Sequence, residues 1–162
     1  MNSRKNSPKK PVQDSQVEMT ELVLPNDTNQ LGNLLGGRLM HWMDIAAAIA
    51  AQRHSNRVCV TASVDQLSFH QPIRLGEVVI LKASVNRAFG SSMEIGVHVL
   101  TENQLTGEKR VANTAYLTFV ALDNHGRPSE VPAVVPETDE ETRRFNEALQ
   151  RRKDRLLHRA KK

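Results

Sequence analysis

The pattern of apolar and polar residues changes along the chain, and its longest apolar stretch predicts a helix. The longest apolar stretch lies within residues 33–52, where the run from Trp42 to Ala51 contains one polar residue, Asp44. A helix that is apolar on all sides is buried inside a protein, and at about 1.5 Å per residue this one is too short to cross a bilayer. Its many alanines imply that other backbone approaches it closely. We therefore predict a buried central helix that ends near Arg53.

A period of two residues predicts strands after the helix. Four strand-like segments, joined by short turns, are 58–70, 79–85, 93–99 and 110–122. The last of them has apolar residues on both faces, which predicts a central strand. The alternation in the first of them changes phase near Asp65, as a β-bulge would cause. A shorter alternating segment, 17–24, precedes the helix. Consecutive strands with short connections pair antiparallel, so the chain predicts an α+β fold, an antiparallel sheet wrapped around one long central helix.

The two ends of the chain differ in composition from its middle. The N-terminal sixteen residues are polar and basic with two prolines, and we expect them to be disordered. Thr138 and Glu141 have the spacing of a capping box, which predicts a C-terminal helix over about 139–159. Its apolar stripe is thin, so docking on a neighbour and fraying in solvent both remain open. The predicted parts are a disordered basic tail, one domain and a C-terminal extension with a helix: 1–16, 17–125 and 126–162.

Composition narrows the class of protein. A chain of 162 residues with 39% hydrophobic and 25% charged residues suits one globular domain. The single Cys59 excludes an internal disulfide and a multi-cysteine metal site, and the histidines lack metal-ligand spacing, so no metal is expected. No apolar run has the length of a membrane span or forms the core of a signal peptide. We expect a cytoplasmic protein with no membrane partner.

The net charge of +4 raises the possibility of a nucleic-acid partner. Much of the positive surplus lies in the first ten and the last dozen residues, outside the expected core. Aromatic residues that could stack on bases are not interleaved with it. We therefore expect solvated basic tails and no nucleic-acid partner.

The start of the predicted central helix combines residues suited to an active site. Gly36 and Gly37 leave backbone amides uncovered, and amides at a helix N-terminus receive a negative oxygen. Asp44 follows them on the same helix, and Asn33 precedes them. Each has a structural alternative: Asp44 as an acid bonded to a backbone amide, Asn33 as a cap, and the glycines as a site of close packing.

Three stretches of the chain carry a resemblance to a known family. They read Asn-Asp-Thr-Asn-x-x-Gly-Asn-x-x-Gly-Gly-x-x-Met-x-x-x-Asp over 26–44, Phe-His-Gln-Pro-Ile-x-x-Gly-Glu-x-Val over 69–79, and Arg-x-x-Gly-Ser-Ser-Met over 87–93. In this order the chain resembles the hotdog-fold acyl-CoA thioesterases of the acyl-CoA hydrolase group. The resemblance covers about residues 17–125 and leaves out both tails.

The resemblance implies a fold, an assembly and a reaction. The fold is a single hotdog domain that dimerises edge to edge and forms trimers of dimers, a hexamer. The reaction, part of fatty acid metabolism, is hydrolysis of a fatty acyl-CoA to a free fatty acid and coenzyme A, with no cofactor. Asp44 would be the general base or, as an alternative, the nucleophile. Asn33, from the opposite subunit, would donate to the thioester carbonyl or hold the water, and Gly36 and Gly37 would bind the oxyanion.

Further residues have expected contacts with the substrate. Contacts with the CoA phosphates are expected from a group of basic and hairpin residues: Arg57, Arg87, Gly90, Ser91 and Ser92. An ordinary hairpin and a solvated arginine are the alternatives. Phe69 is expected in the core rather than in an acyl pocket.

Two other functions remain open at this point. One is a hotdog dehydratase acting on hydroxyacyl thioesters, since His41 lies three residues from Asp44, although the dehydratase pattern around it is lacking. The other is a non-catalytic acyl-CoA-binding regulator. Acyl chain length depends on packing across the subunit interface, which composition does not fix.

Overall fold

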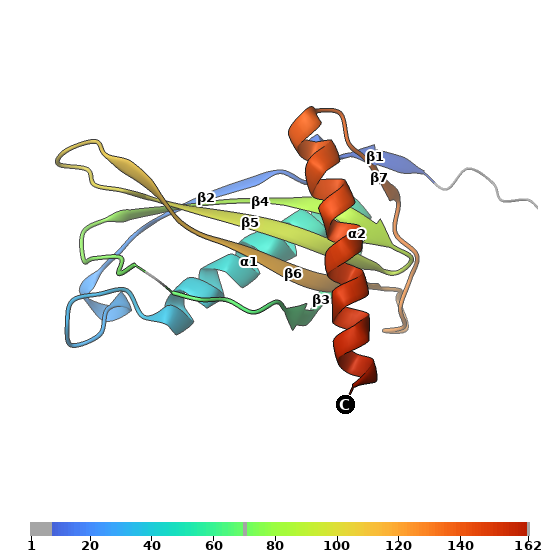
Figure 1. Ribbon diagram of the computed structural model, residues 1–162, viewed down its shortest axis with the longest axis horizontal. Helices are drawn as coiled ribbons and strands as arrows, with labels where there is room; N and C mark the ends of the chain where they lie inside the picture. The colour runs from blue at the N-terminus through green and yellow to red at the C-terminus, as the bar shows by residue number, and fades with distance from the viewer. Residues whose placement is uncertain (1–7, 70, 162) are drawn as a thin grey trace, which may run out of the picture.

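The sheet of this protein curls around one long helix. The computed structural model describes residues 8–69 and 71–161 (Figure 1). Its elements are β1 (Lys9–Pro11), η1 (Val12–Ser15), β2 (Val17–Leu22), η2 (Pro25–Asp27), α1 (Gly36–Ser55), β3 (Val58–Val64), β4 (Val78–Phe89), β5 (Ser92–Glu102), β6 (Lys109–Leu122), β7 (Ala133–Val135) and α2 (Asp139–Ala160). Five strands form an antiparallel sheet in the order β2-β4-β5-β6-β3. The predicted α+β hotdog fold, with α1 inside the sheet and a second helix at the C-terminus, is confirmed.

The core lies between α1 and the concave face of the sheet. Alternate residues of β4 and β5 supply it, each at most 3% exposed: Val79, Leu81, Ala83, Val85, Met93, Ile95, Val97 and Val99. On α1, four alanines are fully buried: Ala46, Ala47, Ala50 and Ala51. Side chains this small let the sheet approach the helix backbone closely, as the alanine-rich sequence predicts.

One side of α1 is not covered by the sheet. Met40 and Ile45 are 40% and 37% exposed. The neighbouring strand β3 is an edge strand, and it exposes Val58, Val60 and Val64. The prediction of a helix buried on all sides is therefore wrong for a single chain, because the sheet ends at β3 before it closes around α1. An exposed apolar edge strand of this kind is a template for pairing with another chain.

Residues 9–15, the N-terminal arm, form β1 and η1. β1 pairs in parallel with β7, and the Lys10 ammonium donates to the carbonyl of Arg53 at 3.2 Å, at the C-terminal end of α1. A cation there satisfies an orphan carbonyl and complements the helix dipole. Ser15 is buried and its hydroxyl oxygen accepts a hydrogen bond from the amide of Val85 at 2.9 Å.

This arm differs from the disordered tail expected over residues 1–16. Only contacts with α1, β4 and β7, all distant in sequence, order it, and its own composition gives no sign of them. Residues 1–7 lie outside the described residues.

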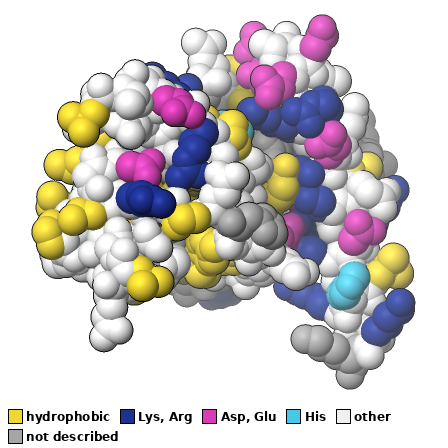
Figure 2. Space-filling model, turned by 60° about the vertical axis from the view of Figure 1, so that its left-hand side comes forward, with side chains coloured by type: hydrophobic (Ala, Val, Ile, Leu, Met, Phe, Trp, Pro, Cys, Tyr) yellow, Lys and Arg dark blue, Asp and Glu magenta, His cyan; other side chains and the backbone are white. Residues whose placement is uncertain are grey.

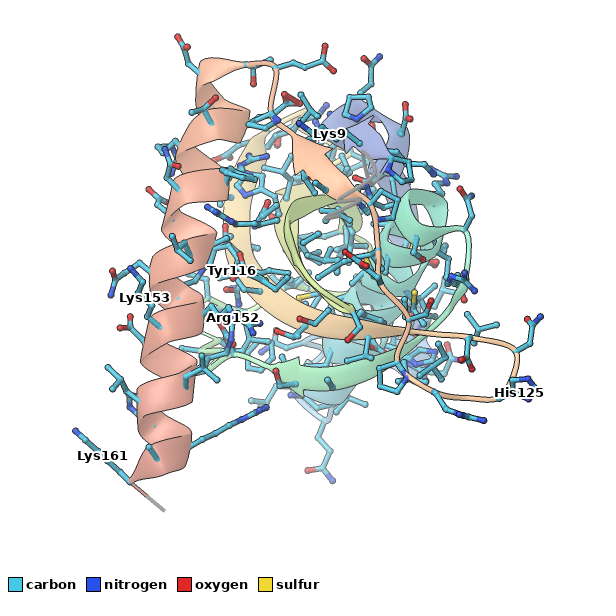
Figure 3. All side chains as sticks on the ribbon, turned by 90° about the vertical axis from the view of Figure 1, so that its right-hand side faces the viewer. Lys9, Tyr116, His125, Arg152, Lys153 and Lys161 are labelled. Atoms are coloured by element: carbon cyan, nitrogen blue, oxygen red, sulfur yellow. The ribbon has the colours of Figure 1, made fainter. Side chains whose placement is uncertain are left out.

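The C-terminal helix α2 docks on the outer face of its own sheet (Figures 1 and 3). Glu94 of β5 is fully buried there. Its carboxylate accepts three hydrogen bonds from Arg151, at 3.2, 3.0 and 2.7 Å, one from Arg155 at 3.3 Å and one from the Asn86 side-chain amide at 2.9 Å. The guanidinium of Arg151 also stacks over Tyr116, 3.7 Å from the ring centre. The sequence leaves docking and fraying in solvent both open for this helix, and the structure shows that it docks.

His54, near the end of α1, predicts a pH dependence of stability. It is fully buried, and its Nε2 donates to the carbonyl of Pro132 at 2.7 Å. Burial lowers the pKa of His54 because an imidazolium would lose its hydration; the Pro132 hydrogen bond and Asp14 oppose this, and Lys10 adds to it. The unfolded chain therefore binds a proton more readily than the folded one. Below pH 6.5 the free energy of unfolding should fall, by at most about 1.4 kcal/mol per pH unit.

This loss should stop once the pH is below the folded-state pKa of His54, and above the unfolded value the residue contributes no pH dependence. Urea unfolding between pH 5 and pH 8 measures it. His54→Gln should remove this component of the slope, and His125→Gln, in an exposed loop, should keep it. Equal slopes for the two variants would contradict the assignment.

Candidate active site

A tight loop at residues 29–33 precedes α1. The Asn29 side-chain oxygen accepts hydrogen bonds from the amides of Leu31 and Asn33, at 2.9 and 3.2 Å. The Asn29 amide in turn donates to the carbonyl of Asn33 at 2.9 Å. Gly32, at φ 76°, makes the turn between them. Because the oxygen of the Asn29 side chain is occupied, its NH₂ group is the part that can donate to a ligand.

The first two residues of α1 offer free amides. Leu35 is the N-cap, and the N–H groups of Gly36 and Gly37 have no hydrogen-bond partner among the described residues. A Cβ added at Gly37 would meet no atom within 4 Å, whereas one at Gly36 would lie 3.3 Å from the ring of Phe69. With the positive end of the helix dipole behind them, these amides suit a developing oxyanion.

Asp44 lies two turns further along α1 and is partly exposed. One of its oxygens accepts a hydrogen bond from the hydroxyl of Thr61, at 2.7 Å. Thr61 belongs to β3 and borders the bulge between Thr61 and Ser63. Thr61 is not among the residues predicted from the sequence, where the change of phase in this segment is the one signal pointing to it. The second Asp44 oxygen has no protein donor among the described residues, so it can accept from water.

A cavity of about 340 Å³ opens beside the start of α1. Its lining is mostly apolar: Leu34, Gly36, Leu39, Phe69, Gln71, Pro72 and Ile73. Phe69 is 49% exposed, so its predicted place in the core is wrong. The segment after β3 leaves the sheet before residue 69, and the ring packs over Gly36 instead.

A larger cavity, about 440 Å³, lies under α2 on the outer face of the sheet. Figure 2 shows the hollow between α2 and the body of the molecule. Its lining, which includes Lys82, His98 and Arg144, contains none of the residues predicted for catalysis or CoA binding. The two cavities share no lining residue.

Comparison with known proteins identifies the family. Residues 31–108 match the Thioesterase superfamily. The Bacillus subtilis protein named uncharacterized acyl-CoA thioester hydrolase YkhA is 47% identical over 148 residues, which cover 90% of this chain and 86% of that protein. The chain belongs to the hotdog acyl-CoA thioester hydrolases. This acyl-CoA thioesterase also matches mouse acyl-coenzyme A thioesterase 11, 42% identical over 146 residues, but spans 24% of that longer protein.

Solved structures agree with this family. The acyl-CoA hydrolase of Staphylococcus aureus, in complex with butyryl coenzyme A, coenzyme A and coenzyme A disulfide, has a TM-score of 0.90 and 38% identity, covering 95% of this chain and 94% of its own. An apo-hexameric acyl-CoA thioesterase has a TM-score of 0.91 and 38% identity, with 94% and 98% covered. These relatives favour hydrolysis over the dehydratase and the non-catalytic regulator.

The Staphylococcus aureus enzyme was also solved as three alanine variants, of an aspartate, an asparagine and a threonine. In its sequence the asparagine lies fifteen residues before that aspartate and the threonine seventeen after it.

The predicted CoA-binding turn of the thioesterase lies at the far end of the sheet from the start of α1 (Figure 1). Gly90 has φ 63°, and the carbonyls of Gly90 and Ser91 accept hydrogen bonds from the amides of Val131 and Ala121, each at 2.9 Å. Ser92 donates from its hydroxyl to the carbonyl of Phe89, at 3.1 Å. The backbone of this turn is therefore bonded to β6 and to the segment between β6 and β7.

The two predicted CoA-binding arginines have different surroundings. Arg57 is exposed just before β3, which starts beside the end of β6 and so near the turn. Arg87 instead packs under α2, with its guanidinium 3.9 Å from the ring centre of Phe145 and donating to the Phe145 carbonyl at 3.1 Å. Burial lowers the pKa of Arg87. The structure thus leaves Arg57 open to a phosphate and gives Arg87 a packing partner.

The described residues also bear on metal binding and membrane insertion. In the described residues, no three His, Cys, Asp or Glu side chains are grouped so that they could hold a metal. Neither α1 nor α2, the two long helices of the described chain, is apolar enough over its length to cross a membrane. The cytoplasmic location stays a prediction.

Proposed function

We propose that this thioesterase hydrolyses fatty acyl-CoA to a free fatty acid and coenzyme A, with Asp44 as the general base. The observation that carries the proposal is the hydrogen bond from Thr61 to one Asp44 oxygen, at 2.7 Å. It fixes the carboxylate and leaves its other oxygen to a water molecule. The departing thiolate is stable, since thiols titrate near ~8.5, so no general acid is required. Water activation and oxyanion stabilisation are the two tasks left.

The site needs two subunits. Eight residues of helix separate Asp44 from Gly36, about 12 Å along the axis. That is too far for both to act on one thioester carbonyl. The exposed edge strand β3 offers a route to a second chain: pairing of two such edges about a two-fold axis would bury Val58, Val60 and Val64. Asp44 of one subunit would then face the free amides of the other, and such dimers would form a trimer of dimers.

An asparagine from the loop before α1 completes the proposed site. Asn33 is the residue predicted from the sequence. Asn29 is a second candidate, because Asn29, Asp44 and Thr61 repeat the spacing of the three residues varied in the Staphylococcus aureus enzyme. The geometry supports Asn29 as well, since the oxygen of its side chain is bound within the loop and its NH₂ group is free to donate. Contacts of the CoA phosphates with Arg57 and the turn at 90–92 remain part of the proposal.

Matched substitutions distinguish the two asparagines. Asn29→Asp keeps the acceptor oxygen that closes the loop and removes the donating NH₂ group, and Asn33→Asp is its control. If Asn29 is the donor, kcat should fall about 10²–10³-fold in the first variant and much less in the second. The reverse order would assign the role to Asn33. Wild-type kcat in both variants would contradict a side-chain amide donor.

The reaction itself is tested with purified protein. Acyl-CoAs from acetyl to palmitoyl are supplied one at a time, and thiol release is followed with a thiol reagent. Release of free CoA in proportion to free acid supports hydrolysis. Water loss from a hydroxyacyl-CoA without thiol release would support the dehydratase instead.

A further inference from the structure

We propose that the cavity beside Gly36 receives the acyl group, and that the ring of Phe69 sets the longest acyl chain it accepts. This inference rests on the proposed function, because it assigns the specificity of the same site. It concerns the residue that closes the cavity rather than the residues that perform hydrolysis.

The position of the cavity links it to the reacting carbon. Gly36 lines the cavity and also carries one of the two free amides at the start of α1. A thioester whose carbonyl oxygen accepts from these amides has its acyl carbon chain beginning at the cavity mouth. The chain then has this partly open, mostly apolar cavity within reach, and burial of an aliphatic tail there is favourable.

Most of the described cavity wall is apolar. Five of its lining residues are apolar side chains: Leu34, Leu39, Phe69, Pro72 and Ile73. The one polar side chain, Gln71, already accepts a hydrogen bond from Arg110 at 2.6 Å, and Arg110 also donates to the Pro72 carbonyl at 2.7 Å. This wall therefore suits a hydrocarbon chain better than a polar ligand.

Most of the wall is fixed, and Phe69 is the exception. Leu39 and Ile73 are 2% and 5% exposed and belong to the core, and the Leu34 amide donates to the Ile73 carbonyl at 2.7 Å. Phe69 is 49% exposed and packs its ring directly over the backbone of Gly36. A change of side chain at Phe69 therefore alters the length of the cavity without disturbing the core.

The size of the cavity suits a small ligand group. About 340 Å³ is near the lower end of small-molecule pockets, which span roughly 300–1,000 Å³. Because chain length also depends on packing across the subunit interface, the role of Phe69 is tested by the change in chain-length preference when Phe69 is substituted.

The test compares kcat/KM across acyl-CoAs from acetyl to palmitoyl for the wild type, Phe69→Ala and Phe69→Trp. Removing the ring should raise the long-to-short ratio of kcat/KM at least about 10-fold, the effect of a methylene or more of pocket space. The larger Trp ring should lower that ratio. Leu75→Ala is the control, because Leu75 is equally exposed, at 49%, near the same end of α1 but outside the cavity.

Opposite shifts for the Ala and Trp variants, with an unchanged profile for Leu75→Ala, would support the assignment. An unchanged chain-length profile, a uniform fall over all substrates, or shifts in the same direction for both variants would overturn it. Failure of the wild type to release CoA from any acyl-CoA would instead overturn the proposed function, so the two failures are distinguishable.

Discussion

Asp44→Asn is expected to lower kcat/KM for acyl-CoA hydrolysis by about 10²–10⁴-fold, the usual contribution of a general base. Asparagine has the shape of aspartate and can still accept the Thr61 hydrogen bond, so the loss isolates the basic oxygen. KM should change little, because the carboxylate acts on water rather than on the bound substrate. Thiol release measures the rate, and size-exclusion chromatography verifies the assembly. Wild-type activity in a folded Asp44→Asn oligomer would contradict the role of Asp44.

Mixed oligomers test whether the site is shared between subunits. Asp44→Asn chains are unfolded, refolded together with chains of the inactive asparagine variant, and assayed. If the base and the asparagine come from different subunits, half of the dimers are mixed and each has one intact site, which gives roughly a quarter of the wild-type activity. If both residues came from one chain, no mixed dimer would contain a complete site and no activity would return.

Glu94→Ala is expected to destabilise the protein by about 3–5 kcal/mol, because it leaves two arginines against the sheet without their buried partner. For a chain of this length that lowers Tm by roughly 6–20 °C. The lower end is favoured, since the Arg151 and Arg155 side chains are each 20% exposed and Arg155 keeps its pair with Asp65 at 3.0 Å. Thermal unfolding at a fixed protein concentration measures the change, and limited proteolysis reports release of α2.

Two variants accompany this experiment. Glu94→Gln keeps the shape and the acceptor for Asn86 and removes the charge, so it should also destabilise the protein, but less. Glu147→Ala breaks pairs of a 44% exposed carboxylate with Arg143 and Arg151, for which less than about 1 kcal/mol is expected. A Glu94→Ala protein no less stable than Glu147→Ala would contradict the role of Glu94 in docking α2.

Local sequence patterns predicted the elements of this fold well. The apolar run predicted α1, the period of two predicted β4 and β5, and apolar residues on both faces of 110–122 predicted β6. Thr138 and Glu141 form the predicted capping box, in which the Glu141 amide donates to the Thr138 hydroxyl at 3.1 Å. The bulge in β3 lies between Thr61 and Ser63, slightly before its predicted place. These features depend on residues that are neighbours in the sequence, so a single sequence is enough to predict them.

The features that were missed depend on partners far along the chain. Glu94 reads as one more polar residue on an alternating strand, and its burial follows from arginines more than fifty positions later. Thr61 becomes a candidate site residue only when the fold places β3 against α1, where its hydroxyl reaches Asp44. Asn29 and Asn33 sit in one turn-forming stretch, and the use of the Asn29 oxygen within the loop distinguishes them.

The contact between Gly36 and Phe69 has a consequence for how the sequence can vary. A methyl group at residue 36 and the aromatic ring at residue 69 would compete for one volume, since their separation would be 3.3 Å. A side chain at residue 36 would therefore require the Phe69 ring to shift by a few tenths of an ångström. The two positions therefore constrain each other in any homologue that keeps this packing, although thirty-three places separate them in the chain.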